Sequence, residues 1–262
     1  MAKIEKPEAL RNFKKILEVT DAVMVARGDL GVEIEPEKVP IYQKKIIQAC
    51  NRAGKPVITA TQMLDSMIRN PRPTRAETSD VANAIIDGTD AIMLSAETAS
   101  GDFPVESVET MVRIAKDVEN AGLLASMVPS GSVSTVAQAV AESSCRTAAT
   151  LKAKAIAVFT RSGSTAALIS AFRPSTQIIA FTASPEIRRR LSIYWGVQCT
   201  EVGVMENTDQ QIYEVDKKLL ATGFRNGDQV IISMGLIETR GSTNLMKVHK
   251  LGTHGYYEVF EE

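Results

Sequence analysis

Val23-Met24-Val25-Ala26-Arg27-Gly28-Asp29 is a short apolar run that ends in small and polar residues, and two similar runs follow it along the chain. The three runs are centred on Met24, Ile58 and Ile92, so they repeat every 34 residues. This period accommodates one strand, one loop and one helix, the unit of parallel β/α sheets and barrels. Tetratricopeptide arrays have a similar period, but their helix pairs would not contain short apolar runs next to Gly or Pro. The repeat therefore predicts buried parallel strands whose carboxyl ends carry the polar residues.

The composition of the chain limits the class of protein. Its 262 residues, 44% of them hydrophobic, suffice for two domains or for one barrel of roughly 250 residues. A net charge of -1 with dispersed Lys and Arg argues against a nucleic-acid partner. Cys50, Cys145 and Cys199 lie far apart without a CxxC motif, which predicts buried thiols in a reducing compartment rather than a zinc site or disulfides. With no signal peptide and no apolar run near the roughly 18 residues of a membrane span, we expect a cytoplasmic protein without membrane contact.

The segments before and after the first apolar run predict helices. One covers about Pro7 to Glu18 and has a single apolar stripe. The next covers about Glu37 to Ala53, where Gly54 suits the position after the helix and Pro56 prevents its continuation.

Two more helices are predicted further along. Thr74 and Glu77 form a capping-box pattern at the start of a helix that ends at Gly88. Its apolar face is predicted to contain Val81, Ala84 and Ile85. Another helix starts near Pro104, and we expect it to bury Val105, Val108, Met111, Ile114 and Ala115.

Residues 122 to 134 break this pattern with Pro, Ser and Gly, as interdomain linkers do. A second α/β domain is predicted over residues 135 to 262, beginning with an Ala-rich helix from about Val136 to Leu151. Its strands are predicted at Ala155–Phe159, Ile178–Phe181, Val197–Val202, Gln229–Met234 and Asn244–Val248, and its further helices near Thr165–Phe172, Pro185–Leu191 and Ile212–Gly223. This pattern predicts a three-layer α/β/α domain with a mostly parallel five-stranded sheet.

Six short motifs follow one another over about the first hundred residues. They are Lys3-Ile4-Glu5, MVARGDLGVEI (24–34), ATQML (60–64), NPRPTRAE (70–77), SDVANA (79–84) and MLSAET (93–98). In the order and spacing of these motifs the chain resembles a pyruvate kinase, and the resemblance extends over nearly its whole length, up to His249. The resemblance implies that residues 1 to 121 form about four βα units, or half, of a (β/α)8 barrel. It also implies that the amino-terminal barrel half and the lid domain are absent, and that residues 135 to 262 form an effector and oligomerisation domain.

The resemblance implies an activity as well. Pyruvate kinases transfer phosphate from phosphoenolpyruvate to ADP in glycolysis, giving pyruvate and ATP, and this chain would carry half of that active site. The K⁺ site, an arginine that contacts the phosphoryl group and much of the nucleotide clamp would lie outside it. Two alternatives stay open, a non-catalytic regulatory fragment and one half of a split enzyme. Because a half barrel exposes two sheet edges, we expect a complementary barrel half or a homo-oligomer to cover them.

By the same resemblance, two acids and a lysine form the centre of the active site. Glu5 and Asp29 would hold Mg²⁺ or Mn²⁺, for which carboxylate oxygens are suitable ligands. Lys3 would place its compact ammonium on the transferring phosphoryl group. The alternatives are a solvated glutamate, a helix-capping aspartate and an exposed lysine.

Substrate contacts are implied after the first and second apolar runs. Ala26, Arg27, Gly28 and Asp29 would bind substrate, with backbone N–H groups at Gly28 and Asp29 available to a carboxylate, or would form only a tight turn. Thr61 would be a catalytic residue near the substrate methylene, or simply a helix-capping hydroxyl.

A cationic loop contains Arg69, Arg72 and Arg75 around two prolines. By resemblance, it reaches the active-site region of a neighbouring subunit, and an exposed charged loop is the alternative. Glu97 is expected to support the end of the barrel.

Two hydroxyl-rich segments of the second domain resemble the effector site of regulated pyruvate kinases, which implies a phosphorylated sugar or nucleotide as ligand. The first follows a strand and opens a helix, so that hydroxyls and N–H groups can converge on an anion. Its residues are Thr160, Arg161, Ser162, Gly163, Ser164 and Thr165. The second segment contains Arg240, Gly241, Ser242 and Thr243. Ordinary Ser-rich caps are the alternative.

Overall fold

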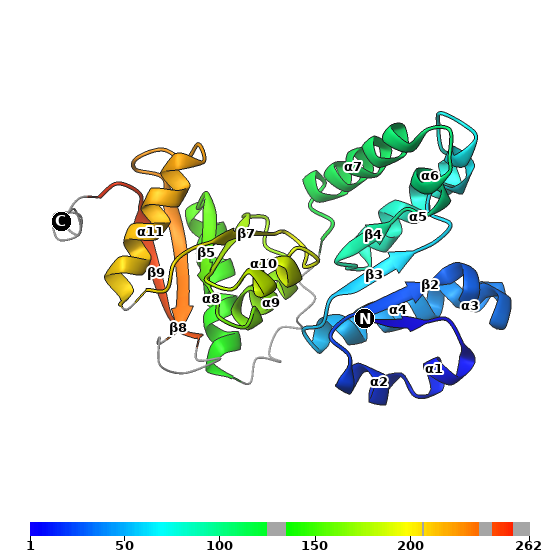
Figure 1. Cartoon of the computed structure of the whole chain (residues 1–262), viewed down its shortest axis with the longest axis horizontal. Coiled ribbons are helices and arrows are strands. Elements are labelled where there is room, and N and C mark those ends of the chain that lie inside the picture. The colour runs from blue at the N-terminus through cyan, green and yellow to red at the C-terminus, as the bar shows by residue number, and fades with distance from the viewer. Residues whose placement is uncertain (125–134, 206, 236–242, 254–262) are drawn as a thin grey trace. The chain divides into compact units, whose positions relative to one another are not determined.

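The computed structural model describes residues 1–124, 135–205, 207–235 and 243–253 (Figure 1). The chain divides into two compact units, Met1–Val128 and Pro129–Glu262, and each has its own sheet. Most of the linker predicted over residues 122 to 134 lies outside the described residues. Within the described ranges, no helix has the length and apolar character needed to cross a membrane.

The first unit contains a sheet of four parallel strands. In sheet order they are β1 (Ala2–Ile4), β2 (Val23–Ala26), β3 (Val57–Ala60) and β4 (Ala91–Met93). Met24 lies beside Ile58 in the register, so the centres of the first two repeats pair directly. The parallel β/α arrangement predicted from the 34-residue repeat is therefore confirmed.

The helices of the first unit connect and follow these strands. They are α1 (Pro7–Arg11), α2 (Phe13–Val19), α3 (Arg27–Glu33), α4 (Val39–Arg52), α5 (Arg75–Ile86), α6 (Ala96–Ala99) and α7 (Pro104–Asn120), with short 3-10 turns at Pro36–Lys38 and Asp65–Ile68. The prediction of one unbroken first helix is wrong, because Asn12 separates α1 from α2. Asn12 has φ of -102° and ψ of 12°, outside the helical region, although its N–H still bonds to the Glu8 carbonyl.

Helix α5 has the predicted start, end and buried face. Thr74 Oγ1 accepts from the Glu77 N–H while the Glu77 carboxylate accepts from the Thr74 N–H, which completes the capping box. Gly88 follows the helix with φ of +96°, a conformation that glycine adopts at little cost. The predicted apolar residues Val81, Ala84 and Ile85 are all buried.

The buried face of α7 differs from the prediction. Val105 and Val108 are 64% and 48% exposed, so their predicted burial is wrong. The helix carries two apolar stripes, and one of them packs beside α5 (Figure 1). Of the residues predicted to face inward, Met111 and Ile114 are buried in this stripe, and Ala115 is partly buried against the same core. The buried residues of α7 are Ser107, Thr110, Met111, Ile114 and Val118.

The second unit has a five-stranded sheet in the order β7-β6-β5-β8-β9, in which only the β8–β9 pair is antiparallel. Its elements are α8 (Val136–Leu151), β5 (Ala155–Phe159), α9 (Ser164–Ala171), β6 (Ile178–Thr182), α10 (Pro185–Leu191), β7 (Val197–Glu201), α11 (Thr208–Ala221), β8 (Gln229–Gly235) and β9 (Thr243–Lys250). The predicted mostly parallel five-stranded sheet is confirmed.

Alternate residues of the central strands enter two different cores. Ile156 and Val158 pack in one core with residues of α8, α9 and α10. Ala157 and Phe159 pack in the other with residues of α11. Because each face of the sheet is covered by helices, the strands are apolar on both sides, and the predicted three layers are present.

Candidate active site

The carboxyl ends of the four parallel strands of the first unit meet at one edge of the sheet. A polar side chain follows each strand: Glu5 after β1, Asp29 after β2, Thr61 after β3 and Glu97 after β4. Parallel order therefore gathers residues from four distant parts of the sequence at one edge.

A lysine and two carboxylates are in direct contact at this edge. The Lys3 Nζ atom lies 2.6 Å from Glu5 Oε2 and donates a hydrogen bond of 2.8 Å to Asp29 Oδ2. Because both oxygens touch one nitrogen, the two carboxylates are close enough to share a small ion. All three side chains are partly exposed, so the cluster is open to solutes.

The contact between Lys3 and Asp29 shifts the pKa of both groups. Contact first with Asp29 and then with Glu5 raises the pKa of Lys3 above its ordinary value. The hydrogen bond from Lys3 lowers the pKa of Asp29 below its usual range. Lys3 and Asp29 therefore both carry their charges at neutral pH.

The donor atoms of the cluster fit a divalent cation. Glu5 Oε2 is buried, and within the described ranges no donor reaches it with hydrogen-bond geometry, although the Lys3 ammonium is 2.6 Å away. A carboxylate oxygen with unfilled acceptor positions beside a second carboxylate suits Mg²⁺ or Mn²⁺. The described residues contain no group of three or more His, Cys, Asp or Glu side chains that could hold a metal. A cation held by Glu5 and Asp29 would therefore take its other ligands from substrate or water.

Thr61 binds the start of a neighbouring β/α unit. Its Oγ1 atom accepts a hydrogen bond of 2.7 Å from the Gly28 N–H and lies 2.6 Å from the Ala60 carbonyl oxygen, to which it donates. A Cβ atom at Gly28 would lie 3.2 Å from this hydroxyl, so glycine permits the close approach. The Gly28 N–H, one of the groups expected to bind a carboxylate, is thus already hydrogen-bonded to Thr61.

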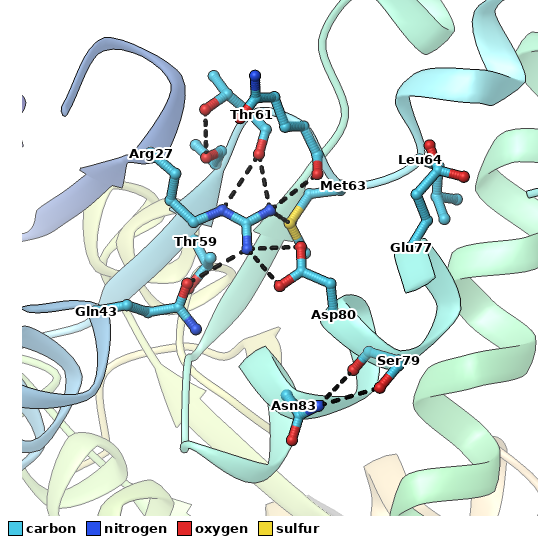
Figure 2. A network of polar contacts seen from close by, with 12 residues as sticks. Arg27, Gln43, Thr59, Thr61, Met63, Leu64, Glu77, Ser79, Asp80 and Asn83 are labelled. Atoms are coloured by element: carbon cyan, nitrogen blue, oxygen red, sulfur yellow. Dashed lines mark hydrogen bonds and ion pairs between the residues drawn. The ribbon is translucent and has the colours of Figure 1, made fainter. Parts of the chain in front are cut away.

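The Arg27 side chain is buried and points into the protein, as Figure 2 shows. It forms an ion pair of 2.7 Å with Asp80 of α5 and hydrogen bonds with the carbonyl groups of Thr61 and Gln62. A substrate could therefore contact the backbone of Arg27, whereas the Arg27 guanidinium is already bound by protein groups. The remaining contacts of the guanidinium are with Gln43 and Met63.

The buried network around Arg27 is not predicted by the motifs of the sequence. Asp80 lies within the SDVANA motif, one position before the buried Val81, and an acid at the margin of an apolar helix face was the available signal. Gln43 on α4 gave no such signal. A buried arginine needs acceptor groups for its N–H donors. An arginine directly after an apolar strand, such as Arg27, therefore indicates buried acceptors nearby.

Two glutamates support the loops around the site. Glu97 is 2% exposed and accepts hydrogen bonds from the Leu64 N–H and the Ser95 N–H, so it joins the loops after β3 and β4 as expected. Glu77 accepts from both the backbone and the hydroxyl of Ser66 at 2.6 Å, in addition to its capping-box bonds. Buried or half-buried carboxylates thus fix the backbone of the loops at this edge of the sheet.

The cationic loop is at the surface. Arg69 forms an ion pair of 3.2 Å with Asp102, and its side chain is 72% exposed. Arg72 and Arg75 are exposed as well. The expected contact of this loop with a neighbouring subunit stays a prediction.

The two hydroxyl-rich segments of the second unit meet at one point. Thr165 Oγ1 lies 2.6 Å from Thr243 Oγ1, and both side chains are buried. At the start of α9, Thr160 Oγ1 accepts from the Gly163 N–H, and the hydroxyls of Ser162 and Ser164 lie 3.0 Å apart. Arg161 is exposed at the same loop. The predicted effector residues Arg240, Gly241 and Ser242 lie outside the described residues.

Comparison with known proteins accounts for both units. Residues 1–108 match the profile of the pyruvate kinase barrel domain, and residues 138–249 match that of the pyruvate kinase alpha/beta domain. The chain belongs to the pyruvate kinase family. It is 51% identical over 255 residues to a pyruvate kinase of Bacillus licheniformis and 52% identical over 256 residues to one of Staphylococcus aureus. A crystal structure of a pyruvate kinase from Cryptosporidium parvum superposes with a TM-score of 0.82 at 42% identity.

The chain matches only part of these pyruvate kinases. Each of the two bacterial matches covers 95% of this chain but 43% and 44% of the relative. The structural match likewise covers 95% of this chain and 50% of the other. The chain thus spans less than half the length of the curated pyruvate kinases that it resembles.

Proposed function

We propose that this chain supplies one part of the active site of a phosphotransferase that converts phosphoenolpyruvate and ADP into pyruvate and ATP. The observation that supports the proposal is the contact of Lys3 with both Glu5 and Asp29 at the carboxyl ends of adjacent parallel strands. Phosphoryl transfer depends on cations placed around the phosphate and on preorganised groups near the developing charge.

Each residue has a role in this proposal. The Lys3 ammonium neutralises charge on the transferring phosphoryl group. Glu5 and Asp29 would hold Mg²⁺ or Mn²⁺, which would supply Lewis-acid chemistry at the substrate oxygens. Ala26, Arg27, Gly28 and Asp29 present backbone to the substrate, except that the Gly28 N–H stays bound to the Thr61 hydroxyl. In this proposal the Thr61 hydroxyl lies near the substrate methylene.

Additional protein is needed for turnover. Loss of one electrostatic donor typically costs ~10²–10³ in rate. Because the matched pyruvate kinases are more than twice as long, we expect negligible turnover from this 262-residue chain by itself. β1 and β4 are also the outer strands of the described four-stranded sheet, so we propose that a complementary barrel half or a second copy pairs with them.

A reconstitution experiment tests the proposal. The purified chain is mixed with the amino-terminal barrel half and lid of a pyruvate kinase, and pyruvate formation is followed in a coupled assay. We expect turnover from the mixture only, with Lys3→Met and Glu5→Gln each reducing it by ~10²–10³. Lys6→Met, next to the cluster in sequence, is the matched control and should keep full turnover. Complex formation by light scattering without turnover, or full turnover with Lys3→Met, would overturn the proposal.

A second candidate function is the binding of a phosphorylated sugar or nucleotide by the second unit. It is favoured by the contact of Thr165 with Thr243, which joins the two predicted effector segments. Saturation at 100 times Kd should stabilise the folded chain by about 2.7 kcal/mol. A thermal-shift titration with sugar phosphates measures this, and Ser164→Asp should abolish the shift through charge repulsion, whereas Ser192→Asp, directly after α10, should keep it. No shift with any sugar or nucleotide phosphate would exclude this function.

A further inference from the structure

We propose that Arg27 is a positioning residue that holds the Thr61–Gln62 turn in a left-handed conformation and thereby fixes the Thr61 hydroxyl. The inference deepens the proposed function and rests on the role given there to Thr61. It differs from a substrate-binding role for Arg27, because the guanidinium is buried and bound by protein groups.

The turn after β3 has a backbone conformation that its sequence does not favour. Thr61 and Gln62 have φ of +67° and +55°, in the left-handed region. A positive φ is uncommon for residues other than glycine and is an outlier for a β-branched residue such as threonine. Two such residues in succession persist only where the surrounding structure fixes them.

The Arg27 guanidinium supplies that constraint. Its Nη2 atom donates to the Thr61 carbonyl at 2.8 Å and to the Gln62 carbonyl at 3.1 Å, and its Nε atom reaches the Thr61 carbonyl at 3.3 Å. The Nη1 atom is held by Asp80 at 2.8 Å, which keeps the planar group in place (Figure 2). One rigid fork therefore binds the carbonyl oxygens of both left-handed residues.

The constraint reaches the proposed active site through Thr61. In the left-handed turn, the Thr61 hydroxyl accepts the Gly28 N–H at 2.7 Å, and Gly28 is adjacent to Asp29 in α3. Arg27 also belongs to α3, so two contacts join α3 to the turn. The Arg27 guanidinium binds the Thr61 carbonyl, and the Gly28 N–H binds the Thr61 hydroxyl. Release of the carbonyls would let the turn relax and would move the hydroxyl away from Gly28.

The competing explanation is that Arg27 only pairs with Asp80 in the interior. Lysine could keep a charge opposite Asp80 but cannot present the planar fork to two carbonyls. Asp80→Asn removes the negative partner of Arg27 but leaves the guanidinium able to bind both carbonyls. The two variants therefore separate positioning from ion pairing.

NMR of the full 262-residue chain tests the inference. The readouts are the ¹³Cα and ¹³Cβ shifts of Thr61, which report its backbone conformation, and hydrogen exchange of the Gly28 amide. In Arg27→Lys we expect the left-handed shift pattern to be lost and Gly28 to exchange about tenfold faster, as for the loss of one hydrogen bond. Asp80→Asn should keep both signals in the folded chain. Arg11→Lys is the matched surface control, since Arg11 pairs with Glu8 on α1.

Unchanged Thr61 shifts and Gly28 exchange in folded Arg27→Lys would overturn the inference, as would equal changes in Asp80→Asn. If Arg27→Lys unfolds, Arg27→Gln replaces it with the same expected changes at Thr61 and Gly28, because glutamine also lacks the planar guanidinium, and unchanged signals in folded Arg27→Gln would likewise overturn the inference. In the reconstituted mixture, Arg27→Lys should lower kcat by roughly 10- to 100-fold with the KM for ADP unchanged. Failure of the proposed function appears separately, as absence of turnover from the unmodified mixture.

Discussion

Lys3 on β1 and Asp29 on α3 belong to successive β/α units, yet the Lys3 Nζ and Asp29 Oδ2 atoms lie 2.8 Å apart. The ammonium stands where two carboxylates converge, since it also contacts Glu5. It therefore compensates their mutual repulsion in the absence of any other cation. A metal that binds the two acids must compete with, or act alongside, this lysine.

Lys3→Met should change metal binding and catalysis in opposite directions. Without the ammonium, Glu5 and Asp29 become an uncompensated pair of carboxylates, which favours a divalent cation. We expect Mn²⁺ to bind the variant chain about tenfold more tightly in an electron paramagnetic resonance titration, because one competing charge is removed. Lys6→Met should leave the affinity unchanged, and weaker Mn²⁺ binding by Lys3→Met would contradict the assignment of the site.

The ion pair between Lys3 and Asp29 should stop contributing to stability at both low and high pH. The pKa of Asp29 is lowered in the folded chain, so the stability from its charge is present above its unfolded pKa and is lost as pH falls through the lower folded value. The pKa of Lys3 is raised, so its contribution is present below its unfolded pKa and is lost as pH rises through the folded value. The carboxyl ¹³C shift of Asp29 should titrate below its ordinary range and return to it in Lys3→Met. An unchanged Asp29 titration in that variant would refute the pairing.

Glu77→Gln should destabilise the first unit. Burial by itself would raise the pKa of Glu77, but hydrogen bonds from Ser66 and Thr74 outweigh it and hold the pKa below its usual value. Stability from Glu77 is thus present above its unfolded pKa and is lost as pH falls through the folded one. Glutamine replaces one accepting oxygen by a donor group, which should cost about 1–3 kcal/mol in urea unfolding at neutral pH.

The matched control for this prediction is Glu8→Gln, which breaks an exposed ion pair with Arg11 on α1. Such pairs contribute roughly 0–1 kcal/mol. The difference between the two variants should shrink as the pH is lowered, because Glu77 becomes protonated in both the folded and the unfolded states. Equal unfolding midpoints for the two variants at neutral pH would show that the Glu77 bonds contribute little.

The three cysteines should react slowly with thiol reagents. Burial raises the pKa of Cys50 and of Cys145 to about 12, so their thiolate fraction near pH 8 is on the order of one in ten thousand. Burial also raises the pKa of Cys199, while the neighbouring Arg188 opposes the shift. In labelling with a chromogenic disulfide, we expect Cys199 to react first and the other two only after urea is added. Rapid reaction of all three in the native chain would be inconsistent with this structure.

Much of the architecture could be predicted because it follows from local patterns. Apolar runs near Met24, Ile58 and Ile92 gave the parallel strands, and Thr74 with Glu77 gave the helix start. The α7 face was predicted wrongly because two apolar stripes compete on one helix, and only packing against α5 decides between them. Local periodicity cannot rank two apolar faces of similar composition.

Within the candidate site, composition could not reveal the turn at Thr61 and Gln62. Neither residue is Gly or Asn, so nothing in the local sequence favours a positive φ. We infer that the conformation depends on Arg27, which is 34 positions earlier than Thr61 and is itself paired with Asp80 in another helix. Motif order located the residues of the site, whereas the partners of Arg27 required the three-dimensional structure.

The contact of Thr165 with Thr243 should be measurable as a coupling between α9 and β9. Both hydroxyls are buried and 2.6 Å apart, so removal of one leaves the other with an unfilled position. Thr165→Val or Thr243→Val alone should destabilise the second unit by about 1–3 kcal/mol, and the double variant should cost less than the sum of the two. Thr150→Val in α8, where the hydroxyl donates to the Arg146 carbonyl on an exposed helix, is the matched control and should show no coupling to Thr243→Val. Additive effects of Thr165→Val and Thr243→Val in urea unfolding would mean that the two predicted effector segments are not held together by this pair.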